Sequence, residues 1–455
     1  MKTELPLTAD FQPPSVLPAE PDFSGSVALG ARFHAAIPGG AHTYAKGDDQ
    51  FPEQMAPYIV RGAGCRVWDV DGNEFIEFGA GLRSVTLGHA YAPVVAAARQ
   101  QLELGVNFGR PAVLELETAE EFLDFTRAGD MVKFAKNGSD ATSAAVKLAR
   151  AYTGRSLVAI CHDHPFFSVD DWFIGTTPLR AGIPAAISSL TVSFFYNNLA
   201  SAEALFAHYP SQIACLLLEV EKDVPPAPGF LQGLRRLCDR EGAVLIFDEI
   251  ITGFRWHNQG AQACYGVRPD LSTWGKALAN GFSLAALSGR RELMERGGLH
   301  HPHDRVFLLS TTYGAETHAL AAARAVLHEY QTQPVVDALW QTGRQLAEGL
   351  RQAAQEQGVA EQVQAVGQPC CLVYTTRAAD GQHSAAFRTL FLQETLRRGL
   401  LMPSLIVNYS HTPAVINEVL ERLYDVLGVY RRALEDGVEQ YLRGAPVKSV
   451  YRPRN

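Results

Sequence analysis

The sequence predicts an α/β fold: a large domain built on a mainly parallel β-sheet between helices, joined to a smaller α+β domain. Two observations indicate this fold. Short apolar runs alternate with helical patterns in the first two thirds of the chain, and helical patterns dominate from about Glu316 onward. The runs that have the character of buried parallel strands are Leu157–Ile160, Leu190–Phe194, Ala214–Val220 and Ala243–Phe247.

The first twenty-five residues contain five prolines and several acids, but no apolar core of a signal peptide. We expect this leader to be extended and packed on a partner subunit, with order beginning near Val27. No uncharged apolar run reaches membrane-spanning length. The sequence therefore predicts neither export nor membrane insertion.

Arg66–Phe78 alternates around a tight Asp71-Gly72 turn, which is typical of a β-hairpin. Near the C-terminus we expect short strands at Cys371–Thr375 and Leu400–Val407. Two apolar helical stripes flank these strands: Leu339, Leu346 and Leu350, then Ile416, Val419, Leu420 and Leu423. We divide the chain into an N-terminal segment that contributes to the small domain (1–90), a large domain (91–325) and a C-terminal small domain (326–455).

The composition is that of an ordinary globular protein, with 455 residues, 47% hydrophobic and 19% charged. A net charge of −8 argues against nucleic acid as a partner. The seven cysteines are scattered, mostly within apolar runs, and lack the paired spacing of a zinc site. We interpret them as reduced thiols and expect a cytoplasmic protein.

The strand-like run Ala243-Val-Leu-Ile-Phe-Asp248 ends in a carboxylate. Ligands of open α/β sheets bind at the carboxyl ends of the strands, and a buried carboxylate requires a cation or strong donors nearby. Asp248 is therefore a candidate partner for a protonated ring nitrogen. The alternative is an aspartate that caps the next helix or loop.

Lys276 follows Asp248 by 28 residues, between a Trp-Gly pair and Ala277-Leu-Ala-Asn-Gly281. Small neighbours of this kind allow the amine to lie in an apolar pocket, where desolvation lowers the pKa of a lysine as Schiff-base chemistry requires. A lysine beside a glycine is more often a solvated surface residue. The pairing with Asp248 is what favours the functional interpretation.

The run Val244-Leu-Ile-Phe-Asp-Glu-Ile-Ile-Thr-Gly-Phe-Arg255, followed by Gly266-Val-Arg-Pro-Asp-Leu-Ser-Thr-Trp-Gly-Lys276, resembles the class III aminotransferases, in particular their glutamate-1-semialdehyde aminomutase-like branch. The likeness extends from Pro38 to the C-terminal helices. It implies a pyridoxal 5'-phosphate (PLP) enzyme of fold type I with a seven-stranded-type sheet. Lys276 would be the Schiff-base lysine and Asp248 the partner of the pyridinium nitrogen.

The segment Phe134-Ala-Lys-Asn-Gly-Ser-Asp140 leads into an alanine-rich helix, with Ser139 as the expected cap. A helix N-terminus suits an anion, although most Gly-Ser pairs before a helix are only caps. The resemblance places the cofactor phosphate on Gly138 and Ser139, with Asp140 alongside. It also implies that Thr312 reaches the phosphate of a neighbouring subunit, so that a homodimer shares its active sites.

Many relatives carry Tyr-His-Gly after the strand that follows this helix, whereas this chain has Cys161-His-Asp-His-Pro-Phe-Phe167. We expect His164 to stack on the cofactor ring, with Phe166 as the second choice. His162 and His164 lack an identifiable third ligand, so no metal site is expected. Glu219, at the end of another buried strand, falls where relatives have Glu-Pro, and the resemblance implies that it lies near the ring hydroxyl.

Arg83 is the candidate for binding an anionic substrate group, because it lies in the family's substrate-side loop; a surface arginine is the alternative. The arginine that holds the substrate carboxylate in aminomutases corresponds to Lys46 here, which lacks the forked guanidinium. We therefore expect transamination from an amino acid, glutamate by analogy, to an aldehyde or ketone. An aminomutase or racemase, a decarboxylase and a catalytically silent relative remain the alternatives.

Overall fold

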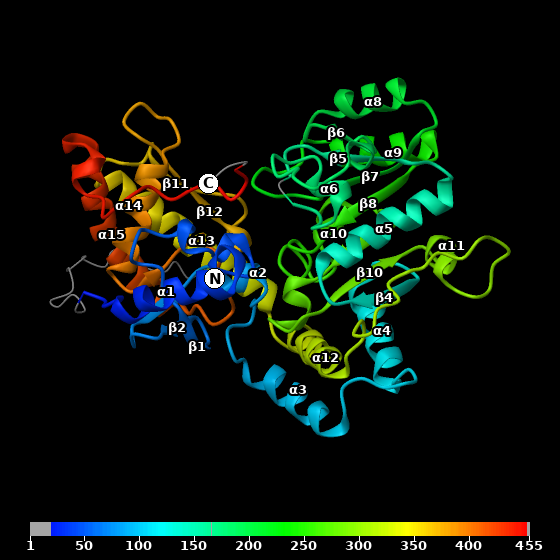
Figure 1. Cartoon of the computed structure of the whole chain (residues 1–455), viewed down its shortest axis with the longest axis horizontal. Helices are drawn as coiled ribbons and strands as arrows, with labels where there is room; N and C mark the ends of the chain where they lie inside the picture. The colour runs from blue at the N-terminus through cyan, green and yellow to red at the C-terminus, as the bar shows by residue number, and fades with distance from the viewer. Residues whose placement is uncertain (1–19, 165, 453–455) are drawn as a thin grey trace, which may run out of the picture.

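The computed structural model describes residues 20–164 and 166–452, which form two lobes side by side (Figure 1). The larger lobe contains a seven-stranded sheet in which only β10 runs antiparallel to its neighbours. This confirms the predicted α/β fold with a mainly parallel sheet. In spatial order its strands are β4 (Met131–Ala135), β10 (Ala285–Gly289), β9 (Leu271–Trp274), β8 (Val244–Asp248), β7 (Ile213–Glu219), β5 (Leu157–Cys161) and β6 (Thr191–Phe194).

Strand β7 shows why both faces of this sheet are covered. Its side chains alternate, so that Leu216 and Leu218 belong to the main core cluster while Cys215 and Leu217 belong to the second one. Helix α5 supplies much of the second cluster, and α4, α8 and α9 pack in the first. The helices of this lobe are α3 (Ala92–Leu104), α4 (Val113–Thr126), α5 (Gly138–Thr153), α6 (Asp171–Ile174), α7 (Ala185–Ser188), α8 (Leu199–His208), α9 (Phe230–Glu241), α10 (Ala261–Tyr265), α11 (Arg291–Met294) and α12 (Thr317–Thr332).

The smaller lobe combines the two ends of the chain, because β13 pairs in parallel with β3. The antiparallel pair β2 and β3 confirms the predicted hairpin. Its sheets have the orders β1-β2-β3-β13 and β11-β12. The elements are α1 (Ser24–Ala36), β1 (Ile59–Ala63), β2 (Arg66–Asp69), β3 (Glu74–Glu77), α2 (Ala80–Arg83), α13 (Val335–Glu356), β11 (Val363–Val366), β12 (Val373–Thr376), α14 (Ala385–Leu396), β13 (Leu400–Leu401) and α15 (Pro413–Asp436). The domain limits at 90 and 325 stay a prediction.

The strand expected at Leu400–Val407 is wrong in length, since β13 ends at Leu401. Pro403 has no N–H to donate to a ladder, which explains the early end. The chain then forms one isolated bridge between Leu405 and Leu372. The apolar pattern of this run therefore reports burial and not strand length.

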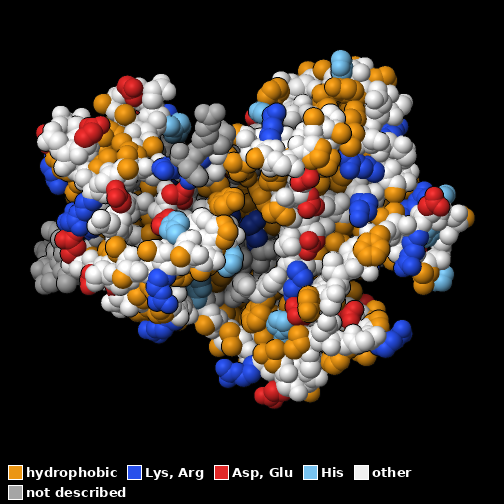
Figure 2. Space-filling view, in the orientation of Figure 1, with side chains coloured by type: hydrophobic (Ala, Val, Ile, Leu, Met, Phe, Trp, Pro, Cys, Tyr) orange, Lys and Arg blue, Asp and Glu red, His pale blue; other side chains and the backbone are white. Residues whose placement is uncertain are grey.

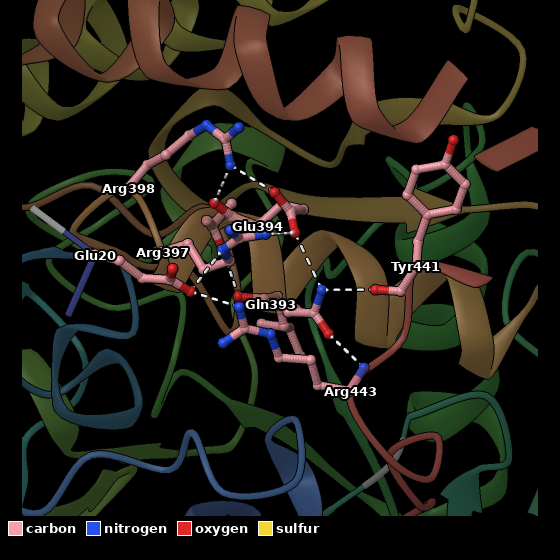
Figure 3. Close-up of polar contacts among 9 residues, drawn as sticks. Glu20, Gln393, Glu394, Arg397, Arg398, Tyr441 and Arg443 are labelled. Atoms are coloured by element: carbon pink, nitrogen blue, oxygen red, sulfur yellow. Dashed lines mark hydrogen bonds and ion pairs between the residues drawn. The ribbon is translucent and has the colours of Figure 1, made fainter. Parts of the chain in front are cut away.

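Both terminal segments are tied to helix α14 (Figure 3). Glu20 pairs with Arg397 and Arg443, while the Gln393 side chain bonds the backbone of Tyr441 and Arg443. Most of the leader expected to be extended lies at residues 1–19, outside the described residues. Helix α1 begins at Ser24, a little before the expected start of order.

Among the helices of the described ranges, none combines the length and the apolar character needed to cross a membrane. All seven cysteines are free thiols, and six of them are buried.

Candidate functional site

Two buried acids lie side by side at the carboxyl edge of the large sheet. Glu219 and Asp248 are register partners on the parallel strands β7 and β8, and each is 4% exposed. Apolar residues on both faces of these strands bury them and so carry the terminal carboxylates into the interior. The edge is the one at which α/β sheets bind ligands.

The Asp248 carboxylate accepts two hydrogen bonds on a single oxygen. Oδ1 receives the backbone N–H of Ile250 at 2.9 Å and the Thr273 hydroxyl at 3.1 Å. Burial raises the pKa of Asp248 to about 6, and these donors together with the Lys276 charge oppose that rise. The second oxygen is available to a cation.

Lys276 begins a short 3₁₀ turn, Lys276–Ala279, directly after β9. Its φ of 45° lies in the left-handed region, which costs a residue with a side chain about 1–2 kcal/mol. Burial lowers the pKa of its amine, while the charges of Asp248 and Glu219 act in the opposite direction. The structure therefore brings the predicted lysine and both acids together.

Glu219 has one carboxylate oxygen, Oε2, that is buried without a hydrogen-bond partner. Burial and the nearby Asp248 charge raise the pKa of Glu219. Its backbone N–H donates to Nδ1 of His164 at 3.0 Å, so the proton of the neutral imidazole lies on Nε2. Burial, with a smaller effect of Lys222, lowers the pKa of His164 to about 3.

The N-terminus of α5 lies next to Ile250, two residues after Asp248. A Cβ on Gly138 would meet Cδ1 of Ile250 at 2.5 Å, so a larger residue there would displace the end of the Ile250 side chain. The expected cap at Ser139 is wrong: Asn137 caps the helix by accepting from the Asp140 N–H, because it is the last residue with extended backbone. Asp140 in turn accepts from the Asn137 side chain at 3.0 Å.

Ser139 is buried and its hydroxyl accepts from the N–H of Val169 at 3.0 Å. Phe166 is 42% exposed and its ring lies against Phe173, whereas His164 is buried beside Glu219. The structure thus places His164, and not Phe166, in contact with Glu219.

The two remaining candidates come from distant parts of the chain. Arg83 ends the short helix α2, and its charge helps to lower the pKa of Lys276, which places it within electrostatic range of the amine. Thr312 is exposed, on the segment that precedes α12. The face between the two lobes is hollowed, with basic side chains in the hollow (Figure 2).

Three residues at this site had no predicted role. Thr273 bonds Asp248, while Arg255 and Asn280 hold the backbone of the loop that carries Arg83. All three stand within the sequence motifs around Asp248 and Lys276, but their partners are 25 to 193 residues away. No local pattern identifies such contacts.

The chain matches the family described as "Aminotransferase class-III" over residues 46–165 and 175–424. It is 33% identical over 428 residues to a glutamate-1-semialdehyde 2,1-aminomutase of Desulforamulus reducens, covering 89% of this chain and 98% of the relative. A glutamate-1-semialdehyde 2,1-aminomutase 2 of Brevibacillus brevis is 31% identical, with 81% and 90% covered.

Among solved structures, the FumI protein of Sphingopyxis sp. MTA144 in its PLP internal aldimine form has a TM-score of 0.82 at 26% identity, covering 90% of this chain and 97% of its own. A glutamate-1-semialdehyde-aminomutase from Pseudomonas aeruginosa PAO1 has a TM-score of 0.77 at 22% identity, with 89% and 94% covered, and supports the fold alone.

The site fits pyridoxal phosphate on its own geometry. A buried carboxylate with one available oxygen suits a protonated ring nitrogen, a lysine with a lowered pKa suits an aldehyde, and the N-terminus of the 16-residue helix α5 suits a phosphate. The chain is an enzyme of fold type I, and it belongs to the class III family of pyridoxal-phosphate-dependent aminotransferases.

Proposed function

We propose that this enzyme transfers the amino group of an amino acid donor to an aldehyde or ketone acceptor, with Lys276 and Asp248 as its catalytic pair. The observation that carries this proposal is the position of Lys276 beside two buried acids at the carboxyl edge of β7, β8 and β9. Glutamate is the donor by analogy.

When bound, pyridoxal phosphate supplies an aldehyde that captures amines and a ring that withdraws electrons from the captured substrate. The Lys276 amine would hold the cofactor's aldehyde and, as the free amine, would accept the proton of the donor's α-carbon. Burial lowers the pKa of this amine, which favours its neutral form as a base.

Asp248 keeps the ring nitrogen protonated through its second oxygen, which strengthens the withdrawal of electrons by the ring. His164, which is buried, would stack on the ring, and Glu219, whose Oε2 has no hydrogen-bond partner, would face the ring hydroxyl. Gly138 and Ser139 hold the phosphate at the positive end of α5. Asp140, alongside, supports this turn through its bonds to Asn137.

A second copy of the chain completes the site. Large apolar side chains on α3, α4 and their connection are more than half exposed, which is unusual for a monomer. They are Leu102, Leu104, Phe108, Val113 and Leu116. Thr312 is exposed beside Tyr313, which is also 59% exposed, as expected if this segment reaches the partner's phosphate. The free thiols support a reducing, cytoplasmic environment.

Arg83 binds an acidic group of the substrate, because it is the guanidinium that lies within electrostatic range of both Lys276 and Glu219 from the opposite lobe. Its planar fork suits a carboxylate.

The second candidate is a glutamate-1-semialdehyde-type aminomutase, since the relatives quoted above bear that name. Against it, Lys46 stands where those enzymes are expected to have an arginine, and its side chain is exposed. An aminomutase moves the amino group within one molecule, so it produces no keto acid.

The test is to incubate the purified enzyme with a panel of amino acids and to follow the visible absorption of the bound cofactor together with keto acid release. We expect one donor to bleach the absorption with one equivalent of keto acid, and Lys276→Ala to abolish both. Lys448→Ala, an exposed lysine far along the sequence, is the matched control. Bleaching without keto acid, while glutamate-1-semialdehyde is isomerised, would favour the aminomutase.

A further inference from the structure

The loop that carries Arg83 has an unusual backbone. Ala80, Gly81, Leu82 and Arg83 are consecutive residues with φ between 45° and 71°, and they form a left-handed turn. Such a conformation costs about 1–2 kcal/mol for each residue with a side chain. It persists only where the surroundings fix it.

Arg255 fixes the end of this turn. Its side chain is fully buried, and Nη2 donates to the backbone carbonyl of Arg83 at 2.7 Å while Nη1 donates to that of Ile251 at 2.7 Å. The guanidinium thus ties the turn to the segment that follows Asp248. Because the planar fork makes both bonds at once, lysine cannot reproduce them.

Asn280 fixes the other end of the loop to the catalytic lysine. It closes the 3₁₀ turn that begins at Lys276, with φ of 45°. Its Oδ1 accepts from the N–H of Leu87 at 2.9 Å, and its Nδ2 donates to the carbonyl of Gly88 at 3.0 Å. One buried amide therefore joins the lysine turn to the substrate-side loop.

We propose that Arg255 and Asn280 are positioning residues that hold loop 79–89, with its left-handed turn at Ala80–Arg83, against the lysine turn and thereby set the recognition of carboxylate substrates by Arg83. This inference rests on the proposed role of Arg83. The loop follows β3 of the small lobe, whereas Arg255 and Asn280 belong to the large lobe, so these bonds decide where the Arg83 guanidinium stands relative to the Lys276 amine.

The experiment measures binding of glutarate, a dicarboxylate without an amine, to the holoenzyme by calorimetry. The variants are Arg83→Gln, Arg255→Lys and Asn280→Gly, the last of which keeps the left-handed backbone and deletes both amide bonds. We expect each to weaken glutarate binding about tenfold. Because Arg255 and Asn280 act through Arg83, the double variant of Arg83→Gln with Asn280→Gly binds no more weakly than Arg83→Gln alone.

Asn197→Gly is the matched control. Asn197 is also left-handed, with φ of 57°, and its amide also bridges two backbone groups, the N–H of Ala227 at 2.7 Å and the carbonyl of Pro225 at 3.0 Å, but on an exposed loop. Loss of the Asn197 side-chain amide leaves glutarate binding unchanged. Hydrogen exchange of residues 80–89 rises in Asn280→Gly and stays at the wild-type rate in Asn197→Gly.

The binding data distinguish the role of Arg83 from the positioning role of Arg255 and Asn280. If Arg83→Gln binds glutarate as tightly as the wild type, the proposed role of Arg83 fails, whatever the cofactor absorption shows. If Arg83→Gln weakens binding but Asn280→Gly and Arg255→Lys do not, or if their effects add to that of Arg83→Gln, the positioning role is overturned. In turnover with a carboxylate donor, a positioning role raises KM and leaves kcat nearly constant, whereas general misfolding lowers kcat and cofactor content together.

Discussion

The hydroxyl of Thr273 donates a 3.1 Å hydrogen bond to the carboxylate of Asp248, and Thr273 stands only three residues before Lys276. Asp248 on β8 and Thr273 on β9 are register partners. One pair of parallel strands therefore positions both members of the proposed catalytic pair. A substitution at Thr273 should alter the hydrogen bonding of the Asp248 carboxylate.

Thr273→Val removes this donor with almost no change in shape. Loss of one hydrogen bond to a charged group costs about 1.5–3 kcal/mol, so we expect cofactor affinity to fall by about tenfold or more. Titration of the apoenzyme with pyridoxal phosphate measures this affinity. Thr273→Ser keeps the hydroxyl and should bind as the wild type does; equal losses in both variants would assign the effect to packing.

Asp248→Asn removes the proposed partner of the ring nitrogen. Breaking one side of a buried ion pair costs about 3–5 kcal/mol, or on the order of a hundredfold or more in affinity. Activity and cofactor content should both collapse. Full turnover in this variant would remove Asp248 from the mechanism.

Glu249→Gln is the matched comparison, because Glu249 is the neighbouring buried acid and holds the N–H groups of Ala261 and Gln262. It should lower the melting temperature while the cofactor stays bound.

A shared active site predicts complementation between inactive chains. Lys276→Ala lacks the lysine of its own site, and Thr312→Ala lacks the threonine it lends to its partner. Mixed after unfolding and refolding, the two should recover up to about a quarter of wild-type activity, because about half of the dimers are mixed and each has one intact site. Thr311→Ala, the adjacent exposed threonine, should be active alone. No recovery on mixing would argue for sites contained in one chain.

His411 gives the protein an acid-sensitive core. Burial lowers the pKa of His411 to about 3, so in the folded protein it stays neutral at pH values where the unfolded chain is protonated. Stability from this group is complete above pH of about 6.5 and is lost as the pH falls toward 3. His411→Asn keeps an acceptor for the N–H of Asn408 and removes the titration.

We expect the slope of unfolding free energy against pH between 4 and 6 to be about 1.4 kcal/mol per pH unit smaller in His411→Asn than in the wild type, measured by urea denaturation. His164, whose pKa is also lowered to about 3 by burial, contributes in the same direction. Identical slopes in both proteins would show that His411 is already protonated in the fold.

The strands β5, β7 and β8 could be predicted from sequence because each is a continuous apolar run, which directly reports burial on both faces. Strands β9 and β10 were missed. They contain Ser272, Thr273, Ser288 and Gly289, whose polarity and small size conceal their burial. The cap was misplaced from Asn137 to Ser139 by two residues, since both residue types cap helices equally well.

By itself the sequence predicted the parallel sheet and the helix that begins at Gly138, because each is encoded by neighbouring residues, and its resemblance to a family implied the pairing of Asp248 with Lys276. Tertiary structure alone decided which residues meet across the two lobes. Arg255 reaches the carbonyl of Arg83 over 172 residues and Asn280 reaches Leu87 over 193, and such bonds depend on how packed lobes place backbone groups that carry no side-chain signature.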